Sequence, residues 1–531
     1  MKMRKKNTII SLCMSALGTI FLIYYIFRGS TDVVASDYIR IINYYLEDVS
    51  DLHFLLSWEG IVRIPFTFLM RFVNVKLFSY SVYFDRIIGT LGLFLFNTVV
   101  LSFTLNHLHT KTMRVLASIL ITYISFSLMA WEMILNGTGY AHFITVGLIA
   151  LTFKIFANAE GIEIDQNANV KSKKYLPICL LIIVTSLCFA GSYSVSYLCT
   201  IIFFSIVFII VKLCQKEKIY IEIMYIVISL LCLALYFKSN NTGEALIPVG
   251  FKDITLVQLL KTEPLFPIKF MLKSLASSII GVETFDYALK FGTINEKFIF
   301  LIGALYLVII IFVIVLLIIK IVNGARIARP YEDDSDETHS ARPYCTRELS
   351  EYTSFFIFIC MFIVSGLANY LLIFLARYKF VVDSYGMTSR YSLQYMFLTT
   401  GIVMLLIKLL DELTLNHIII AENATQLKYN VESDEVTSKH TSNKAVRIFL
   451  MIASILSLSF ITLGHLTTNT DEIFKSDYRK IIYSIVEEKA KNYKNLSDQD
   501  LEDTFEYHRG PEQIRHAFEI LESQKLNIFK N

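Results

Sequence analysis

Residues 298–320 read FIFLIGALYLVIIIFVIVLLIIK, an apolar run with no charged residue before Lys320. A helix of about 20 apolar residues crosses the hydrocarbon core of a bilayer, which is about 30 Å thick. Inside lipid, a single segment can satisfy all of its backbone polar groups only as a helix. The run therefore predicts a transmembrane helix and places the chain among membrane proteins.

Similar apolar runs recur along the whole chain. The composition agrees with them, because 55% of the 531 residues are hydrophobic and only 18% are charged. The sequence therefore predicts an all-α fold, a polytopic transmembrane helix bundle of about eleven spans. The predicted spans are 7–27, 86–106, 115–133, 139–157, 175–192, 194–212, 219–237, 298–320, 353–376, 391–410 and 446–465.

The basic residues are concentrated in alternate connections between the predicted spans. The segment MKMRKK precedes the first span, and the connections around Lys111, Lys173 and Lys216 are also basic. In contrast, the turns at 134–139 and 192–194 contain no Lys or Arg. Because Lys and Arg are enriched in cytoplasmic loops, we expect the N-terminus inside and the C-terminus outside.

This orientation divides the chain into a transmembrane domain and an outer tail. The transmembrane domain comprises residues 1–465 and has two large outer loops, 28–85 and 238–297. An apolar stretch at 270–282 in the second loop is a candidate for dipping into the membrane without crossing it. The tail comprises residues 466–531, which is too short to bury a large core alone. We therefore expect the tail to pack against the outer loops or to lie on the membrane surface.

The tail has a helical pattern in two places. The first predicted helix covers 477–492, and the second begins at Pro511, a residue type favoured at the first position of a helix. In the second helix, Ile514, Phe518 and Leu521 recur at helical spacing. The tail is therefore expected to be helical.

Several function classes find no support in the sequence. The motifs GxxxxGK[ST], GxGxxG, HExxH and GxSxG are absent, which argues against an ATP-driven pump or an enzyme with its own nucleotide-sugar domain. No CxxC pair occurs, and no cysteine lies in the outer segments. The net charge of +3 does not indicate a nucleic-acid partner. The predicted spans are nearly free of ionisable groups, whereas polar residues gather in the outer segments, so we place any active site there.

Of the outer segments, the first outer loop contains the most candidate site residues. Residues 36–51 read SDYIRIINYYLEDVSD, and Ile39, Ile42 and Leu46 share one helical face. This pattern predicts an amphipathic surface helix that begins near Asp37. The spacing alone favours a solvated acid at Asp37, with a catalytic acid as the alternative.

Each of two outer arginines has two interpretations, as an interfacial residue or as a ligand-binding residue. Arg63, in GIVRIPF, is either an arginine whose stem lies along apolar surface at the interface or a phosphate-binding residue. Arg390 and Tyr391, in MTSRYSLQY, open a span as interfacial anchors or as ligand-binding groups. The turn WEMILNG contains Glu132 beside glycine, where backbone can approach a substrate, but a simple helical hairpin has the same sequence features.

This layout resembles the GT-C class of membrane glycosyltransferases. In that class a short N-terminus precedes the first span, and a long outer loop with one or two surface helices carries an essential Asp. This chain has SDYIRII in that place. It also resembles a set of uncharacterised bacterial membrane proteins, although Val62 replaces a His of their pattern. The short motifs that carry this second likeness are VRIPF at 62–66, WEMILNG at 131–137, SRY at 389–391 and LNIF at 526–529.

The resemblance implies roles for specific residues. Asp37 is the implied general base, which accepts the proton of the acceptor hydroxyl, and Asp32 is the reserve choice. The residues implied to hold the donor phosphate are Arg63 and Arg390, with Tyr391 beside them. Glu59 and Glu132 are implied to orient acceptor hydroxyls or to bind a divalent cation. Some members of the class use a metal, but no cluster of metal ligands is evident in this sequence.

The resemblance also implies the substrates and the place of action. The donor is a polyprenyl-phosphate sugar, and the acceptor is a surface polysaccharide or a lipid-linked glycan of the cell envelope. The enzyme acts at the outer face of the bacterial cytoplasmic membrane, alongside a flippase and a transferase that makes the donor.

Three other functions stay open at this point. A polysaccharide polymerase tends to carry a large Arg-rich loop late in the chain, whereas the late loop 377–390 is short here. A flippase or transporter of lipid-linked sugars is expected to have charges inside the spans and internal duplication. A non-catalytic membrane scaffold is the third.

Overall fold

The computed structural model shows an all-helical molecule, with no strand in the part of the chain that it describes. The described residues are 2–47, 49, 65–161, 168–189, 193–240, 252–327, 342–427 and 437–530.

Each predicted span overlaps a helix over most or part of its described length, and the all-helical bundle confirms the predicted fold class. Among the described residues, ten helical segments are long and apolar enough to cross a membrane, and the shorter apolar segment Tyr175–Phe189 lies within the one remaining predicted span, 175–192. The chain is therefore a multi-pass integral membrane protein. The helices that contain the spans are α1 (Lys2–Gly29), α5 (Val82–His107), α6 (Lys111–Ser125), α8 (Tyr140–Gly161), α9 (Ala168–Val184), α10 (Ser194–Cys214), α11 (Tyr220–Asn240), α15 (Glu296–Ile327), α16 (Arg342–Arg377), α17 (Ser392–Leu427) and α18 (Thr437–Lys491).

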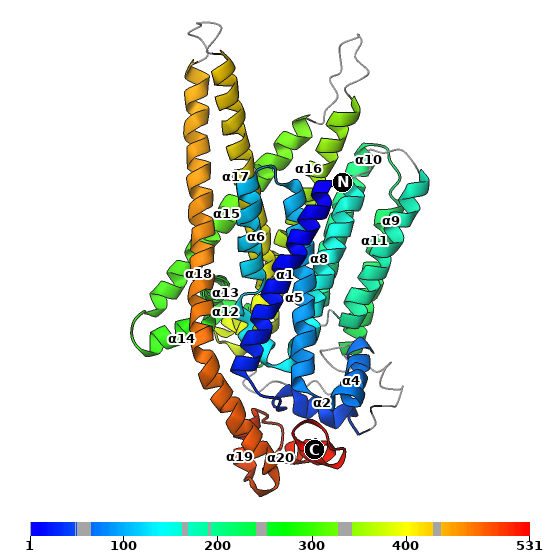
Figure 1. Ribbon diagram of the computed structural model, residues 1–531, viewed down its shortest axis with the longest axis vertical. Helices are drawn as coiled ribbons and strands as arrows, with labels where there is room; N and C mark the ends of the chain where they lie inside the picture. The colour runs from blue at the N-terminus through cyan, green and yellow to red at the C-terminus, as the bar shows by residue number, and fades with distance from the viewer. Residues whose placement is uncertain are drawn as a thin grey trace.

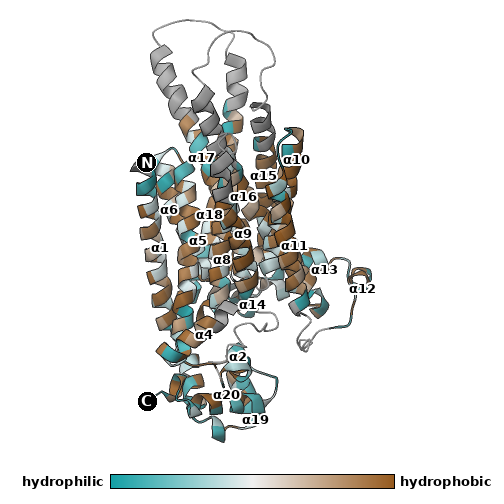
Figure 2. Ribbon diagram, turned by 90° about the vertical axis from the view of Figure 1, so that its right-hand side faces the viewer, coloured by the Kyte–Doolittle hydropathy of each residue, from teal (hydrophilic) through white to brown (hydrophobic). Residues whose placement is uncertain are grey.

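The two ends of the bundle differ in what they carry. The short helices of the first outer loop and the tail gather at the end opposite the N-terminus (Figure 1). Apolar residues dominate the middle of the bundle, and the small helices beyond it are more hydrophilic (Figure 2). We call the end that carries the tail the outer end, in keeping with the predicted sidedness.

The predicted surface helix of the first outer loop is present as α2 (Asp37–Tyr45), and a second short helix, α4 (Pro65–Phe78), follows it. Ile39 and Ile42 of α2 are fully buried, as the helical spacing predicted. The second outer loop contains three short helices, of which α13 packs against α15. At about 1.5 Å per residue, none of these helices is long enough to cross a bilayer. They are α12 (Leu256–Thr262), α13 (Phe266–Ser277) and α14 (Val282–Lys290).

The tail differs from the prediction in one respect. The helix expected at 477–492 is the outer part of α18, which runs without a break from the last span to Lys491. No proline interrupts α18, so its hydrogen-bonded ladder continues beyond the membrane. Two short helices follow, α19 (Asp498–Phe505) and α20 (Pro511–Ser523), and the second begins at Pro511 as predicted.

The tail packs against the first outer loop, which is one of its two predicted placements. Ile39 and Ile42 of α2 share a buried apolar cluster with Phe505 and Phe518 of the tail. The side-chain amide of Asn43 donates to the carbonyl of Gln513 at 2.8 Å. Burial of this apolar surface holds α2 and the tail together as one unit.

The spans carry more buried ionisable groups than the sequence suggested. Lys154 lies inside the predicted span 139–157 and donates to Ser102 at 3.2 Å. Lys212 pairs with Glu222 and, at 3.3 Å, with Glu160. Lys212 and its two partners lie toward the inner ends of their helices, where charges from neighbouring helices pair, whereas Lys154 has a hydroxyl as its partner. Pairing offsets the cost of placing a charge in an apolar medium.

Candidate functional site

Three short elements meet at the outer end, where the chain turns between spans. They are α7 (Trp131–Leu135), η2 (Gly137–Gly139) and η7 (Ser389–Tyr391). The segment α7 contacts both η2 and η7, although η7 is remote in sequence. This arrangement brings two of the predicted site regions, the turn after α6 and the start of α17, into one place.

The predicted residues Glu132 and Arg390 form an ion pair in this region. The guanidinium of Arg390 donates from Nη2 to one carboxylate oxygen of Glu132 at 2.7 Å. The hydroxyl of Ser389 donates to the other oxygen at 2.8 Å. The side chain of Arg390 is 50% exposed, so the guanidinium is accessible from the outer side.

The helix α7 is fixed against α18 by a stacked arginine. The guanidinium of Arg479 lies 3.3 Å from the ring centroid of Trp131. Glu472, which is fully buried, pairs with Arg479 at 2.7 Å and accepts a hydrogen bond from Tyr25. Because Glu132 directly follows Trp131, this stack also sets the position of the Glu132 carboxylate.

Tyr391 is tied to a different partner. Its hydroxyl accepts a hydrogen bond from Nε of Arg377 at 2.6 Å, and its side chain is buried. Arg377 also lies over the rings of Phe380 and Tyr385. Tyr391 therefore lies beneath Arg390 in a fixed position and supports the loop that carries it.

Asp37 is exposed at the start of α2. Its carboxylate forms no hydrogen bond or ion pair with the residues that the structure describes. It lies within electrostatic range of the Arg390 guanidinium and of the His142 imidazole. The prediction placed Asp37 and Arg390 in one site, and the structure brings them into the same region.

The backbone that carries Asp37 is held by the tail. Ser36 has a positive φ of 53°, and its N–H donates to the carbonyl of Phe505 at 2.8 Å. A left-handed conformation is unfavourable for serine, so it persists only where surrounding contacts fix it. The contact with the tail therefore helps to determine where the Asp37 carboxylate lies.

Asp32, the reserve choice for the base, has a different environment. Its carboxylate accepts hydrogen bonds from the N–H groups of Val82 and Tyr83 at 2.6 and 3.2 Å, and from the hydroxyl of Ser81 at 3.0 Å. It also pairs with Lys530 at 3.0 Å. A carboxylate at a helix N-terminus satisfies unpaired N–H groups and the positive end of the helix dipole. Of the two acids, Asp37 is therefore the one that can receive a proton from a ligand.

His142 is a further polar residue near this site, outside the predicted set. The imidazole lies one turn into α8, partly buried, with its ring 5.3 Å from that of Tyr193. Its Nδ1 has no hydrogen-bond partner among the described residues. A histidine three residues after the glycine-rich turn was the available signal, and only the fold brings it within electrostatic range of Asp37.

A second set of residues that the sequence analysis passed over is buried just behind α2. Arg71 and Asp85 form an ion pair, and Asp85 also accepts hydrogen bonds from the hydroxyl of Tyr38 at 2.7 Å and from Asn74 at 3.2 Å. Burial raises the pKa of the Tyr38 hydroxyl, which keeps it protonated as a donor. The ring of Tyr140 lies 5.2 Å from the Arg71 guanidinium. This enclosed pair anchors the first outer loop on α5.

Two predicted site residues, Glu59 and Arg63, lie outside the described residues. Within the described part of the chain, no group of three or more His, Cys, Asp or Glu side chains is arranged to hold a metal ion.

No protein-family model, no curated protein and no solved structure matches this chain. The chemistry of the outer end therefore rests on its own geometry. That geometry combines an acid with no partner among the described residues, an accessible guanidinium and a partly buried imidazole at the outer end of the bundle. Such a set can bind a ligand with a phosphate and accept a proton from a hydroxyl.

Proposed function

We propose that this protein is a membrane glycosyltransferase that works at the outer face of the bacterial cytoplasmic membrane. It moves a sugar from a polyprenyl-phosphate donor to a surface polysaccharide or another cell-envelope acceptor. The observation that carries the proposal is the placement of Asp37, which is exposed, without a partner among the described residues, and within electrostatic range of Arg390 and His142.

Two features of the fold support this function. The first outer loop has two short helices, α2 and α4, as the resemblance to GT-C enzymes implies. The site also lies where the apolar spans end, so a lipid-linked donor could keep its chain in the bilayer while its phosphate reaches the guanidinium.

The proposed reaction needs one base and one positive group. Asp37 accepts the proton of the acceptor hydroxyl while that oxygen bonds to the anomeric carbon. The bond between the anomeric carbon and the phosphate oxygen breaks, and the polyprenyl phosphate leaves with the electron pair. Arg390 stabilises the negative charge that grows on the leaving phosphate. A single base is sufficient for transfer with inversion.

Glu132 holds Arg390 in place before the donor binds. Its carboxylate takes one N–H of the guanidinium, which carries five. Planar guanidinium groups suit phosphate oxygens well. The donor phosphate could therefore join Arg390 at its remaining donors or replace Glu132.

The test compares the surface glycan of the host by mass spectrometry. The strains are wild type, a deletion, Asp37→Asn, and Asp253→Asn as a matched exposed acid in another outer segment. We expect the deletion and Asp37→Asn to lose the mass of one sugar per repeat and Asp253→Asn to keep it, at equal membrane levels of protein.

Other outcomes point elsewhere. If the deletion loses the sugar but Asp37→Asn keeps it, the transferase survives and the assignment of the base fails. An intact repeat that is no longer polymerised favours a polymerase. A glycan unchanged by the deletion contradicts the proposed function.

A further inference from the structure

A small cavity lies among the outer halves of the spans, beside the start of α17. Its volume is about 20 Å³, and roughly 10–15 Å³ is enough to hold a water molecule. No Asp, Glu, Lys or Arg lines it. Its size and lining suit one small uncharged group.

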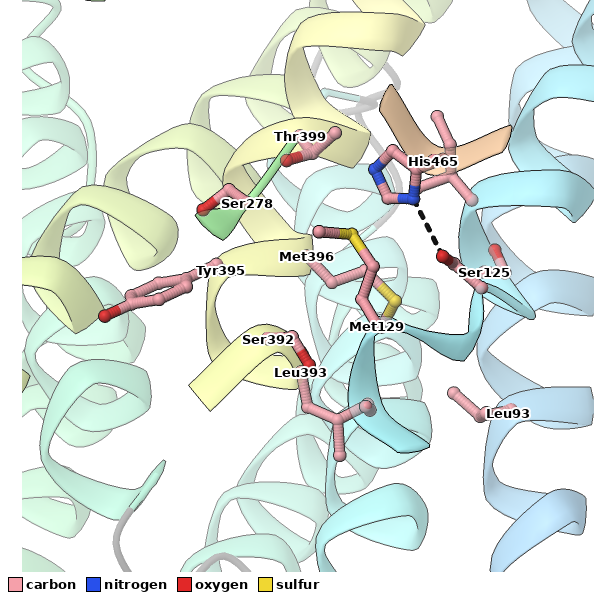
Figure 3. Close-up of a pocket in the computed structure, with 13 residues that line it drawn as sticks. Leu93, Ser125, Met129, Ser278, Ser392, Leu393, Tyr395, Met396, Thr399 and His465 are labelled. Atoms are coloured by element: carbon pink, nitrogen blue, oxygen red, sulfur yellow. Dashed lines mark hydrogen bonds between the residues drawn. The ribbon is translucent and has the colours of Figure 1, made fainter. Parts of the chain in front are cut away.

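The imidazole of His465 forms one wall of this cavity (Figure 3). Its side chain is 4% exposed, and its Nε2 has no hydrogen-bond partner among the described residues. A buried polar atom without a partner is costly, so its retention here indicates that something binds to it.

The hydrogen bonds around His465 determine which kind of group can bind. The N–H of Leu128 donates to Oδ1 of Asn469 at 2.7 Å, so that atom is an acceptor. The hydroxyl of Ser127 contacts the same oxygen at 3.1 Å and must donate to it. Nδ1 of His465 lies 2.9 Å from Ser127, whose oxygen must then accept from an Nδ1–H group. In the neutral imidazole, Nε2 is therefore an acceptor.

Three of the hydroxyls in the wall are also acceptors. The hydroxyl hydrogens of Ser125, Ser392 and Tyr395 are donated to the backbone carbonyls of Ile121, Ser389 and Gly386. Their oxygens keep only lone pairs for a bound group. Together with Nε2 of His465, these three oxygens favour a ligand that donates a hydrogen bond, and without a charged wall the cavity does not favour a cation.

The direction of approach follows from burial. Of the residues that line the cavity, only Ser392 is not fully buried. Ser392 follows η7, two residues after Arg390, so the least buried part of the lining lies at the outer end of the bundle, next to the site described above.

We propose that this cavity binds one hydroxyl or hydroxymethyl group of an uncharged ligand that enters beside Ser392 and donates a hydrogen bond to Nε2 of His465. The assignment of that group to a sugar rests on the proposed function. The same chemistry could come from a lipid alcohol in the bilayer, and the experiment separates the two sources.

The experiment observes His465 directly in the full chain, reconstituted in lipid nanodiscs with ¹⁵N-labelled histidine side chains. The Nε2 signal is assigned by its loss in His465→Gln. Methyl α-glucopyranoside is added from water in one arm, and 1-octanol is added to the bilayer in the other. We expect one probe to shift the Nε2 resonance saturably, because an unprotonated ring nitrogen is sensitive to an incoming hydrogen bond.

Two variants test the cavity itself. Ala130→Val fills it without touching His465, and Ser392→Leu blocks the entrance at a partly exposed position. We expect either change to weaken the response by about tenfold or more, since the added methyl groups occupy the space of the ligand. The response should persist in Asp37→Asn, so failure of the transferase reaction does not affect this readout.

Three results overturn the inference. The first is that neither probe shifts the resonance, and the second is that both variants respond like the unaltered protein. The third is that Nε2 is already hydrogen-bonded to a water that neither probe displaces. A shift with 1-octanol alone keeps the cavity site but assigns it to a lipid alcohol.

Discussion

Two of the ion pairs at the outer end, Arg71 with Asp85 and Arg390 with Glu132, each join an arginine to a carboxylate, yet they differ in nearly every physical respect. The side chains of Arg71 and Asp85 are 2% and 1% exposed, whereas those of Arg390 and Glu132 are 50% and 28% exposed. The carboxylate of Asp85 also has hydrogen-bond donors from two neighbouring side chains. The exposed guanidinium of Arg390 makes one hydrogen bond among the described residues.

This contrast separates stability from function. Removing one member of a buried ion pair leaves a charge without compensation, which costs about 3–5 kcal/mol. An exposed pair contributes roughly 0–1 kcal/mol, because water and salt screen it. A pair of the second kind can exchange its partner for a ligand at little cost. We therefore expect the buried pair to be structural and the exposed pair to carry binding.

The sharpest test of this comparison is Asp85→Asn. The amide keeps the size of the side chain but leaves the Arg71 charge buried without its counter-ion. We expect the free energy of unfolding to fall by about 3–5 kcal/mol. Thermal unfolding of the purified protein in detergent measures the change, with Glu132→Gln as the matched exposed acid. Equal losses in the two variants would show that burial does not separate the pairs.

Substitution of Asp32 should have an intermediate effect on stability, because its side chain is 21% exposed and that of its partner Lys530 is 46% exposed. In Asp32→Ala the N-terminal turn of α5 loses its capping acceptor. We expect the stability to fall by about 1–2 kcal/mol. Glycan transfer per folded molecule should stay near normal, as measured by mass spectrometry at matched membrane levels. Loss of transfer in Asp32→Ala, together with normal transfer in Asp37→Asn, would reverse the roles of the two acids.

Arg390→Gln should have a small effect on stability and a large one on activity. We expect the free energy of unfolding to change by less than about 1 kcal/mol, because the pair is half exposed. We expect transfer to fall by about 100-fold or more, because the leaving phosphate loses its positive partner. The matched control is Arg28→Gln, which breaks the outer pair between Arg28 and Asp477. Normal transfer in Arg390→Gln would remove this residue from the site.

Hydropathy and helical spacing were sufficient for the membrane spans and for the surface helix α2. A bilayer demands long apolar helices, so the spans could be read directly from the sequence. The buried face of α2 followed from Ile39 and Ile42, and the start of α20 followed from Pro511. These are local signals, in which the residue types that form an element lie within that element.

The arrangement of the site residues depends on contacts between residues far apart in sequence, which no local pattern contains. The hydrogen bond between Arg390 and Glu132 joins residues 258 positions apart, and the tail reaches Ser36 from Phe505. Asp32 and Asp37 lie only five residues apart in sequence, and only the fold shows that one caps α5 while the other is left open. The buried pair of Arg71 and Asp85 was overlooked for the same reason, since each residue alone resembles an interfacial charge.

The smallest effect on stability is expected for the ion pair of Lys494 and Glu522. Its side chains are 61% and 43% exposed, which makes it the most exposed of the pairs compared. Hydrogen bonds from Lys494 and from the hydroxyl of Tyr493 lower the pKa of Glu522 from its ordinary value of 4.5. A carboxyl with a lowered pKa stabilises the fold above its unfolded pKa, and this contribution is lost as the pH falls through the lowered value. We therefore expect the tail helices α19 and α20 to become slightly more open to hydrogen exchange below pH 4.5, as followed by mass spectrometry. In Glu522→Gln this pH-dependent part of the exchange should disappear. If the variant keeps the full pH dependence, groups other than the exposed pair control the docking of the tail.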